Sequence, residues 1–237
     1  MATALEDTTM RKVIGFFILA LTFSAATVQA QGLFLDKGQP GIGATAGGAV
    51  IGNAWSVSVT PTYTYRGVFD LGIEIARYAY SKGDANHLSA IGTMPFANVY
   101  FIRSEEGASP VSLSGTLGIQ KRIYMGNGNV PNPDGWGLLL GLSAFRRMEI
   151  SDAFALIPEF FLAYDLQVTT WHSSATDGNS TASMVTQPGQ KSDYDQKPRL
   201  LLRANMAWKS IEKQYIVTPY VGYQAGLAFG ANLGAVF

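Results

Sequence analysis

The sequence predicts an all-β fold: a closed, antiparallel, up-and-down β-barrel of about ten strands. Three observations support it. Apolar and polar side chains alternate along many segments, short and long connections between those segments alternate, and aromatic residues gather at both ends of the segments. A side-chain period of two residues is that of a β-strand whose two faces meet different surroundings.

The N-terminal segment 1–30 is predicted to be a cleaved signal peptide. Arg11 and Lys12 precede an apolar stretch at 13–26, and Val28-Gln29-Ala30 supplies small residues at the expected cleavage site. The apolar stretch is shorter than the roughly 18 to 20 residues that a membrane-spanning helix needs, which favours a signal peptide over an anchor. Because the chain has no cysteine, attachment of a lipid to a new N-terminal cysteine is excluded. Residues 31–237 are then a single barrel domain.

Strands are predicted wherever the alternation is sustained. A membrane strand needs roughly 9 to 11 residues to cross a bilayer, and these segments are long enough. The predicted strands are 41–52, 54–66, 68–80, 88–103, 111–124, 137–148, 153–167, 199–209, 214–224 and 227–237.

The connections alternate in length in the way that outer-membrane barrels do, with short periplasmic turns and longer outer loops. The short ones lie at 66–67, 104–110, 150–152 and 209–213, and the long ones at 81–89, 125–137 and 169–198. A chain that starts and ends on the short-turn side has an even number of strands, and ten fits. The tight connections at 52–54 and 224–226 break the trend, so eight strands are an alternative.

The apolar face of the strands is predicted to contact lipid, which makes the barrel a transmembrane one. Its aromatic residues sort by height, and valine, leucine, isoleucine and alanine lie between them, as at the two interfaces of a bilayer. The other face is rich in hydroxyl groups and glycine and suits a narrow lumen. The lower aromatic set is Tyr65, Phe69, Phe101, Phe154, Trp208, Tyr215 and Phe237, and the upper set is Trp55, Trp136, Tyr164 and Tyr223.

The C-terminal strand ends in phenylalanine, with Leu227, Phe229, Leu233 and Phe237 on alternate positions. Over residues 41–237 the chain resembles the small outer-membrane β-barrel proteins of Gram-negative bacteria, a group that includes OmpX and the membrane domain of OmpA. The resemblance implies a location in the outer membrane, among phospholipid and lipopolysaccharide. It also implies that the barrel assembly machinery reads the terminal strand, including Leu233 and Phe237.

Four prolines conflict with regular strand pairing in a closed barrel. Pro61, Pro95, Pro158 and Pro219 each fall inside a predicted strand, and a closed barrel has no free edge for a residue without an N–H group. We expect β-bulges to accommodate them, including one near Pro95, where the facing of strand 88–103 is ambiguous.

Charged residues on the lumenal face are the candidate site residues. Glu159 and Arg203 lie at the same height on neighbouring strands and are predicted to form an ion pair, extended to Glu74 and Asn205. Arg122 and Asp165 are predicted to form a second cluster near the outer rim. Such pairs fill and rigidify an interior, because a charge in a narrow lumen must be paired or hydrated. The alternative is a charged constriction that selects permeating ions.

The outer loop 169–198 is expected to be solvated, or to bind another cell, a host molecule or lipopolysaccharide through Trp171 and Tyr194. His172 and Ser174 show a His-x-Ser spacing similar to that of outer-membrane lipid A deacylases, in which histidine is the base for a serine nucleophile. Asp165 or Glu159 would then orient the histidine. We expect neither a metal nor a cofactor: there are two histidines and no cysteine, and a closed metal site takes about four ligands.

The composition excludes a nucleic-acid-binding protein and leaves three classes of function. Lys and Arg balance Asp and Glu at 17 each, so no basic field exists for nucleic acid. The leading hypothesis is a non-enzymatic outer-membrane barrel with a structural or surface-adhesion role. The alternatives are a narrow channel for ions or small solutes and, from a different class, a lipid A deacylase-like hydrolase.

Overall fold

The computed structural model describes residues 31–52, 54–80, 89–104, 107, 109–125, 134–172, 190–210, 213–224 and 226–237. The predicted signal peptide, residues 1–30, lies outside them. A short 3-10 helix, η1 (Gln31–Leu33), precedes the strands β1 (Gly41–Ile51), β2 (Ala54–Tyr65), β3 (Phe69–Tyr80), β4 (Ser89–Ile102), β5 (Ser112–Met125), β6 (Asp134–Phe145), β7 (Met148–Ser151), β8 (Phe154–His172), β9 (Gln190–Lys209), β10 (Gln214–Gln224) and β11 (Leu227–Val236).

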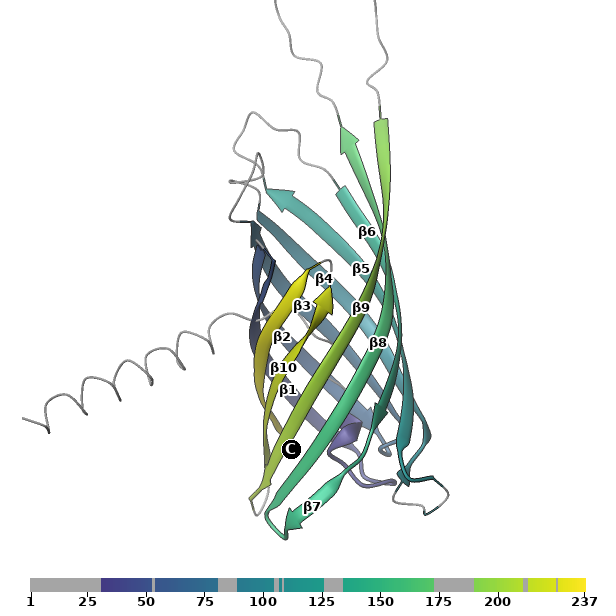
Figure 1. Ribbon diagram of the computed structural model, residues 1–237, viewed down its shortest axis with the longest axis vertical. Coiled ribbons are helices and arrows are strands. Elements are labelled where there is room, and N and C mark those ends of the chain that lie inside the picture. The colour runs from purple at the N-terminus through teal and green to yellow at the C-terminus, as the bar shows by residue number, and fades with distance from the viewer. Residues whose placement is uncertain are drawn as a thin grey trace, which may run out of the picture.

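The strands form a closed antiparallel barrel of ten strands, as predicted (Figure 1). Each strand pairs with its neighbours in the sequence, and β1 closes the barrel on β11, from Gly43↔Val236 to Ile51↔Ala228. The segments β6 and β7 both pair with β8 and together make one barrel strand. The eight-strand alternative is therefore wrong.

The two ends of the barrel differ. The end with the turns at 66–68 and 152–153, where Ser210 N also donates to Lys213 O, is called the lower end, and it lies at the bottom of Figure 1. At the opposite, upper end β8 and β9 extend beyond the other strands (Figure 1). They pair continuously from Phe154↔Trp208 up to His172↔Gln190. Part of the predicted 169–198 loop is thus strand.

The apolar face of the strands points outward, as predicted from the alternation. On β2, Val57, Val59, Tyr63 and Tyr65 are exposed, whereas Ser56 and every second residue up to Thr64 are buried. The same division runs round the barrel. Leu142 on β6 and Leu202 on β9 are more than half exposed, with 60% and 52% of their surface accessible. Most leucines and valines of the strands therefore face outward, and the buried Leu139, Leu201 and Val236 are exceptions.

The aromatic residues at the two ends of the strands also face outward. At the lower end, the rings of Tyr65 and Phe69 are 5.4 Å apart and those of Phe154 and Trp208 are 5.1 Å apart. At the upper end, Trp136 is 55% exposed and carries the Lys121 ammonium 4.7 Å from its ring centre. An ammonium over an aromatic face is the arrangement of a cation–π contact.

The strand prolines cause no bulge, contrary to expectation. All four face outward, and the register is the same on both sides of each. At Pro61, for example, the pairing of β2 with β3 passes from Val59↔Ile75 to Thr62↔Gly72 without a shift. A missing N–H therefore costs local pairing with one neighbour but leaves the register intact. The bulge in β4 lies instead between Tyr100 and Ile102.

The lumen is filled more by large apolar side chains than the hydroxyl-rich pattern suggested. Inward glycines leave room for rings from the neighbouring strand: a Cβ on Gly72 would lie 2.4 Å from the Phe96 ring, and one on Gly230 2.3 Å from the Tyr220 hydroxyl. One buried cluster consists of Ala49, Met94, Phe96, Leu139, Phe161, Ala163, Leu201 and Tyr220. Ten strands enclose enough space for such a layer, and close packing fills it.

Candidate functional site: the lumen and its N-terminal plug

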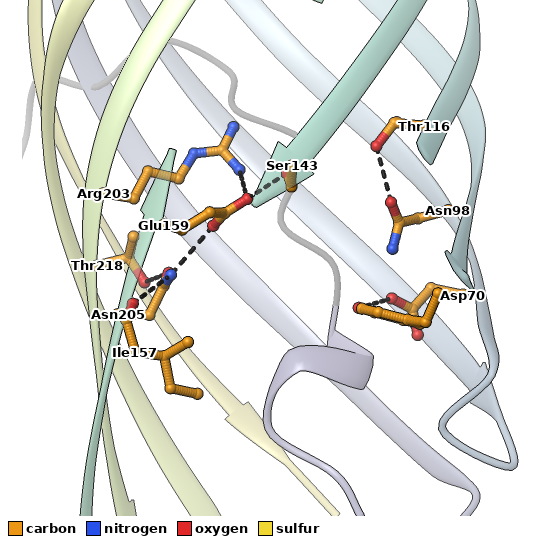
Figure 2. A network of polar contacts seen from close by, with 10 residues as sticks. Asp70, Asn98, Thr116, Ser143, Ile157, Glu159, Arg203, Asn205 and Thr218 are labelled. Atoms are coloured by element: carbon orange, nitrogen blue, oxygen red, sulfur yellow. Dashed lines mark hydrogen bonds and ion pairs between the residues drawn. The ribbon is translucent and has the colours of Figure 1, made fainter. Parts of the chain in front are cut away.

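Residues 31–40 enter the lower end of the barrel and form what we call the plug. Leu33 and Phe34 are 1% and 2% exposed. They pack in one apolar cluster with inward side chains from six strands, and Figure 2 shows the helical turn of the plug inside the barrel wall. The wall residues of this cluster are Tyr100, Phe145, Ile157, Ala207, Ile216 and Val236.

Asp70 binds the plug from the wall. Its two carboxylate oxygens lie 3.0 and 3.2 Å from the backbone nitrogen of Gly32, which donates to them. The Thr64 hydroxyl donates to the same carboxylate at 2.6 Å and the Tyr100 hydroxyl at 2.7 Å. Asp70 is fully buried, so these donors replace the water that its charge would otherwise need.

Arg103 binds the plug through backbone carbonyls. Its guanidinium donates to Leu35 O at 2.9 Å, to Gly32 O at 2.8 Å and to Gly67 O in the turn after β2. The β-bulge at Tyr100/Ile102 explains its position: Phe101 and Ile102 are both exposed, so the next residue turns inward. Guanidinium suits this role because its donors form a rigid fork.

At the lower mouth, two further contacts hold the end of the plug. The Arg147 guanidinium lies 2.8 Å from the Asp36 carboxylate, and the backbone nitrogen of Gly38 donates to Arg66 O at 2.8 Å. Sequence reasoning missed the plug, since 31–40 has neither strand nor helix periodicity. Its only signal is the apolar run Leu33-Phe34-Leu35 directly after the expected cleavage site.

Above the plug, the predicted partners Glu159 and Arg203 are in contact (Figure 2). Arg203 Nη1 donates to Glu159 Oε1 at 3.0 Å, and the Ser143 hydroxyl donates to the same oxygen at 2.6 Å. Asn205 Nδ2 donates to Glu159 Oε2 at 3.0 Å and receives the Thr218 hydroxyl on its own oxygen at 2.9 Å. The carboxylate is thus bound on both oxygens in a buried network.

Glu74 is inward and buried, with 1% of its surface exposed, but the structure does not bring it into this network. Its Oε2 atom has no hydrogen-bond partner among the described residues. Asn205 does join the Glu159 network, through its side-chain amide.

Arg122 and Asp165 lie together higher in the lumen, joined through a residue that sequence reasoning did not select. Arg122 Nη1 donates to Gln167 Oε1 at 2.9 Å, and Gln167 Nε2 donates to Asp165 Oδ2 at 2.8 Å. Asp165 also forms a direct ion pair with Arg199 on β9. Arg199 has the same inward parity as Arg203, which is the signal that could have identified it.

The remaining candidates lie at the ends of the strands. Trp171 belongs to β8 and Tyr194 to β9, where it pairs with Val168, so both are strand residues and not loop residues as expected. His172 is the last residue of β8, whereas Ser174 lies outside the described residues. Leu233 and Phe237 face outward, 42% and 61% exposed.

The described part of the chain contains no group of three or more histidine, aspartate or glutamate side chains placed to hold a metal ion. It also contains no helix long and apolar enough to cross a membrane.

No family model and no curated protein matches the chain, but solved structures do. The translocator domain of the autotransporter NalP from Neisseria meningitidis is similar over 98% of this chain and 97% of its own length, with 11% identity and a TM-score of 0.49. The beta domain of the Bordetella autotransporter BrkA is similar over 85% and 99%, with 12% identity and a TM-score of 0.44. LpxR from Salmonella typhimurium is similar over 83% of this chain and 99% of its own length, with 10% identity and a TM-score of 0.43. At these identities the likeness concerns the fold alone.

Proposed function

We propose that the protein is an integral barrel of the bacterial outer membrane, with a structural or surface role and a closed lumen. The outward apolar band between two aromatic belts supports the membrane location. A water-facing surface rarely exposes a contiguous apolar patch larger than a few hundred Å². Here large apolar residues are exposed on every barrel strand, from Ile42 on β1 to Leu233 on β11.

The single observation that carries the closed lumen is the plug. Leu33 and Phe34 fill the lower end, and the apolar cluster around Phe96 and Phe161 fills the layer above the Glu159 network. Permeation through a pore requires a hydrated path or weakly bound sites along it. A lumen packed with apolar layers and paired charges favours a scaffold over the alternative, a narrow selective channel.

The partners follow from the same geometry. Phospholipid and lipopolysaccharide would contact the apolar band, and the assembly machinery would read the outward residues Leu233 and Phe237. The tall hairpin of β8 and β9, which carries Trp171 and Tyr194, would present any extracellular contact site (Figure 1). The hydrolase alternative rests on His172 and Ser174, and unchanged lipid A in cells that express the protein would exclude it.

Purified protein reconstituted in a planar bilayer is expected to give no single-channel steps. The experiment is informative only if the sample is folded, so the same sample must migrate differently on a denaturing gel before and after boiling. The channel alternative predicts steps whose ion selectivity changes in Glu159→Gln. Regular steps of that kind from the wild-type barrel would contradict the closed lumen.

A further inference from the structure

Charge is distributed very unevenly over the outside of the barrel. Among the outward strand side chains whose exposure the structure describes, from the lower aromatic belt upward, Arg77 on β3 and Lys121 on β5 are the two charged ones. Both are cations, and both lie near the upper end. A charged side chain in an otherwise apolar band is costly unless it reaches an interface or a counter-ion.

The two cations are neighbours across one strand. Arg77 pairs with Ile91 on β4, and Ile91 pairs with Ile123 on β5, two residues from Lys121. Two strand spacings and an offset of two residues separate the two Cα atoms by roughly 12 Å, and the long side chains of Arg and Lys can close that distance around one anion. The Lys121 ammonium lies 4.7 Å from the centre of the Trp136 ring, which places it at the level of the upper aromatic belt.

In the part of the chain that the structure describes, no hydrogen bond or ion pair joins the Arg77 guanidinium to another residue. Arg77 borders an outward groove of about 260 Å³, whose remaining walls are largely apolar and include Val57, Val59, Ile75 and Ile91. An exposed guanidinium above an apolar groove matches a ligand with an anionic head and a hydrocarbon tail.

We propose that Arg77, Lys121 and this groove form a binding site for lipopolysaccharide, with the cations on a phosphate of its lipid A part and an acyl chain in the groove. The inference rests on the proposed function, because the upper end faces the outside of the cell only if the short turns are periplasmic. The outer leaflet then supplies a phosphorylated, multiply acylated lipid at this height.

Native mass spectrometry of the folded barrel in a neutral detergent tests the site, with diphosphoryl lipid A as the probe. We expect Arg77→Gln and Lys121→Gln each to weaken binding about fivefold, the size of a partly exposed ionic contact, and the double variant to weaken it about twentyfold. Lys209→Gln, which removes a cation at the lower rim, is the matched control and should bind as the wild type does. Arg77→Lys and Lys121→Arg should largely retain binding.

Three results would overturn the proposal. They are wild-type affinity in the double variant, equal affinity for a lipid with the same acyl chains and no phosphate, and displacement of lipid A by an equimolar amount of inorganic phosphate. If the double variant fails to fold, the salt dependence of lipid A binding to the wild-type barrel tests the site instead. Binding that does not weaken as the salt concentration rises would exclude an ionic site. A barrel that inserts into membranes but fails these tests refutes this inference alone, whereas one that does not insert refutes the proposed function as well.

Discussion

Replacing Arg203 with methionine is expected to lower the free energy of unfolding by about 3–5 kcal/mol, the cost of leaving a buried charge without its partner. Glu159 is 4% exposed and would keep only the Ser143 hydroxyl and the Asn205 amide as donors. Its charge would then lie beside apolar layers without a counter-charge. Urea unfolding of the purified barrel, followed by gel mobility without boiling, measures the loss.

The double variant Glu159→Gln/Arg203→Met separates the charge from the packing. Because it removes both charges, we expect it to be more stable than Arg203→Met alone, since replacing a whole buried pair costs less than breaking it. Lys209→Met is the matched control: it lies on the same strand, exposed at the lower end, and should change stability by less than about 0.5 kcal/mol. A loss under about 1 kcal/mol in Arg203→Met would mean that water already hydrates Glu159.

Phe34→Ala is expected to weaken docking of the plug by about 3–5 kcal/mol, the usual cost of removing a buried phenylalanine side chain. Leu33→Ala in the same chain should add to this, because the two residues share one apolar cluster with Tyr100 and Ile216. The barrel wall has its own closed hydrogen-bond ladder, so we expect the plug to leave while the wall remains folded. Limited proteolysis should then cut within 31–40 in the double variant and spare the wild type.

Ile42→Ala is the control for the plug experiment. Ile42 lies just beyond the plug but faces outward with 64% of its surface exposed, so its truncation should leave the plug protected. Wild-type resistance to proteolysis in Leu33→Ala/Phe34→Ala, with the barrel still folded, would show that Asp70 and Arg103 hold the plug without its apolar contacts. Release in Ile42→Ala would show that the plug is only loosely held.

The strands could be predicted because the packed lumen and the outside of the barrel require different side chains, and this difference imposes the alternation locally. Strand 214–224 matches β10 to the residue, and the short turns lie at one end as expected. The upper hairpin was predicted too short, because the polar segment 190–198 lacks an apolar face and was interpreted as a loop. Its partner β8 nevertheless pairs with it up to His172.

The lumen could be predicted only in part, because its contacts depend on register and not on local pattern. The same height of Glu159 and Arg203 on adjacent strands follows from counting residues from a short turn. Arg103 could not be placed in this way, since a bulge two residues earlier reverses its facing. The plug was missed for a related reason: an irregular segment is positioned by carbonyl and carboxylate groups of distant residues such as Asp70.

Lipid contact on the apolar face is the central claim, and cysteine scanning along β2 tests it most directly. The chain has no native cysteine, so single labels can be placed at each position from Val57 to Tyr63. In reconstituted membranes, labels at 57, 59, 61 and 63 should be quenched by nitroxide lipids, and labels at 58, 60 and 62 should be protected. Quenching by a water-soluble agent at the odd positions, with no effect of nitroxide lipids, would contradict the account.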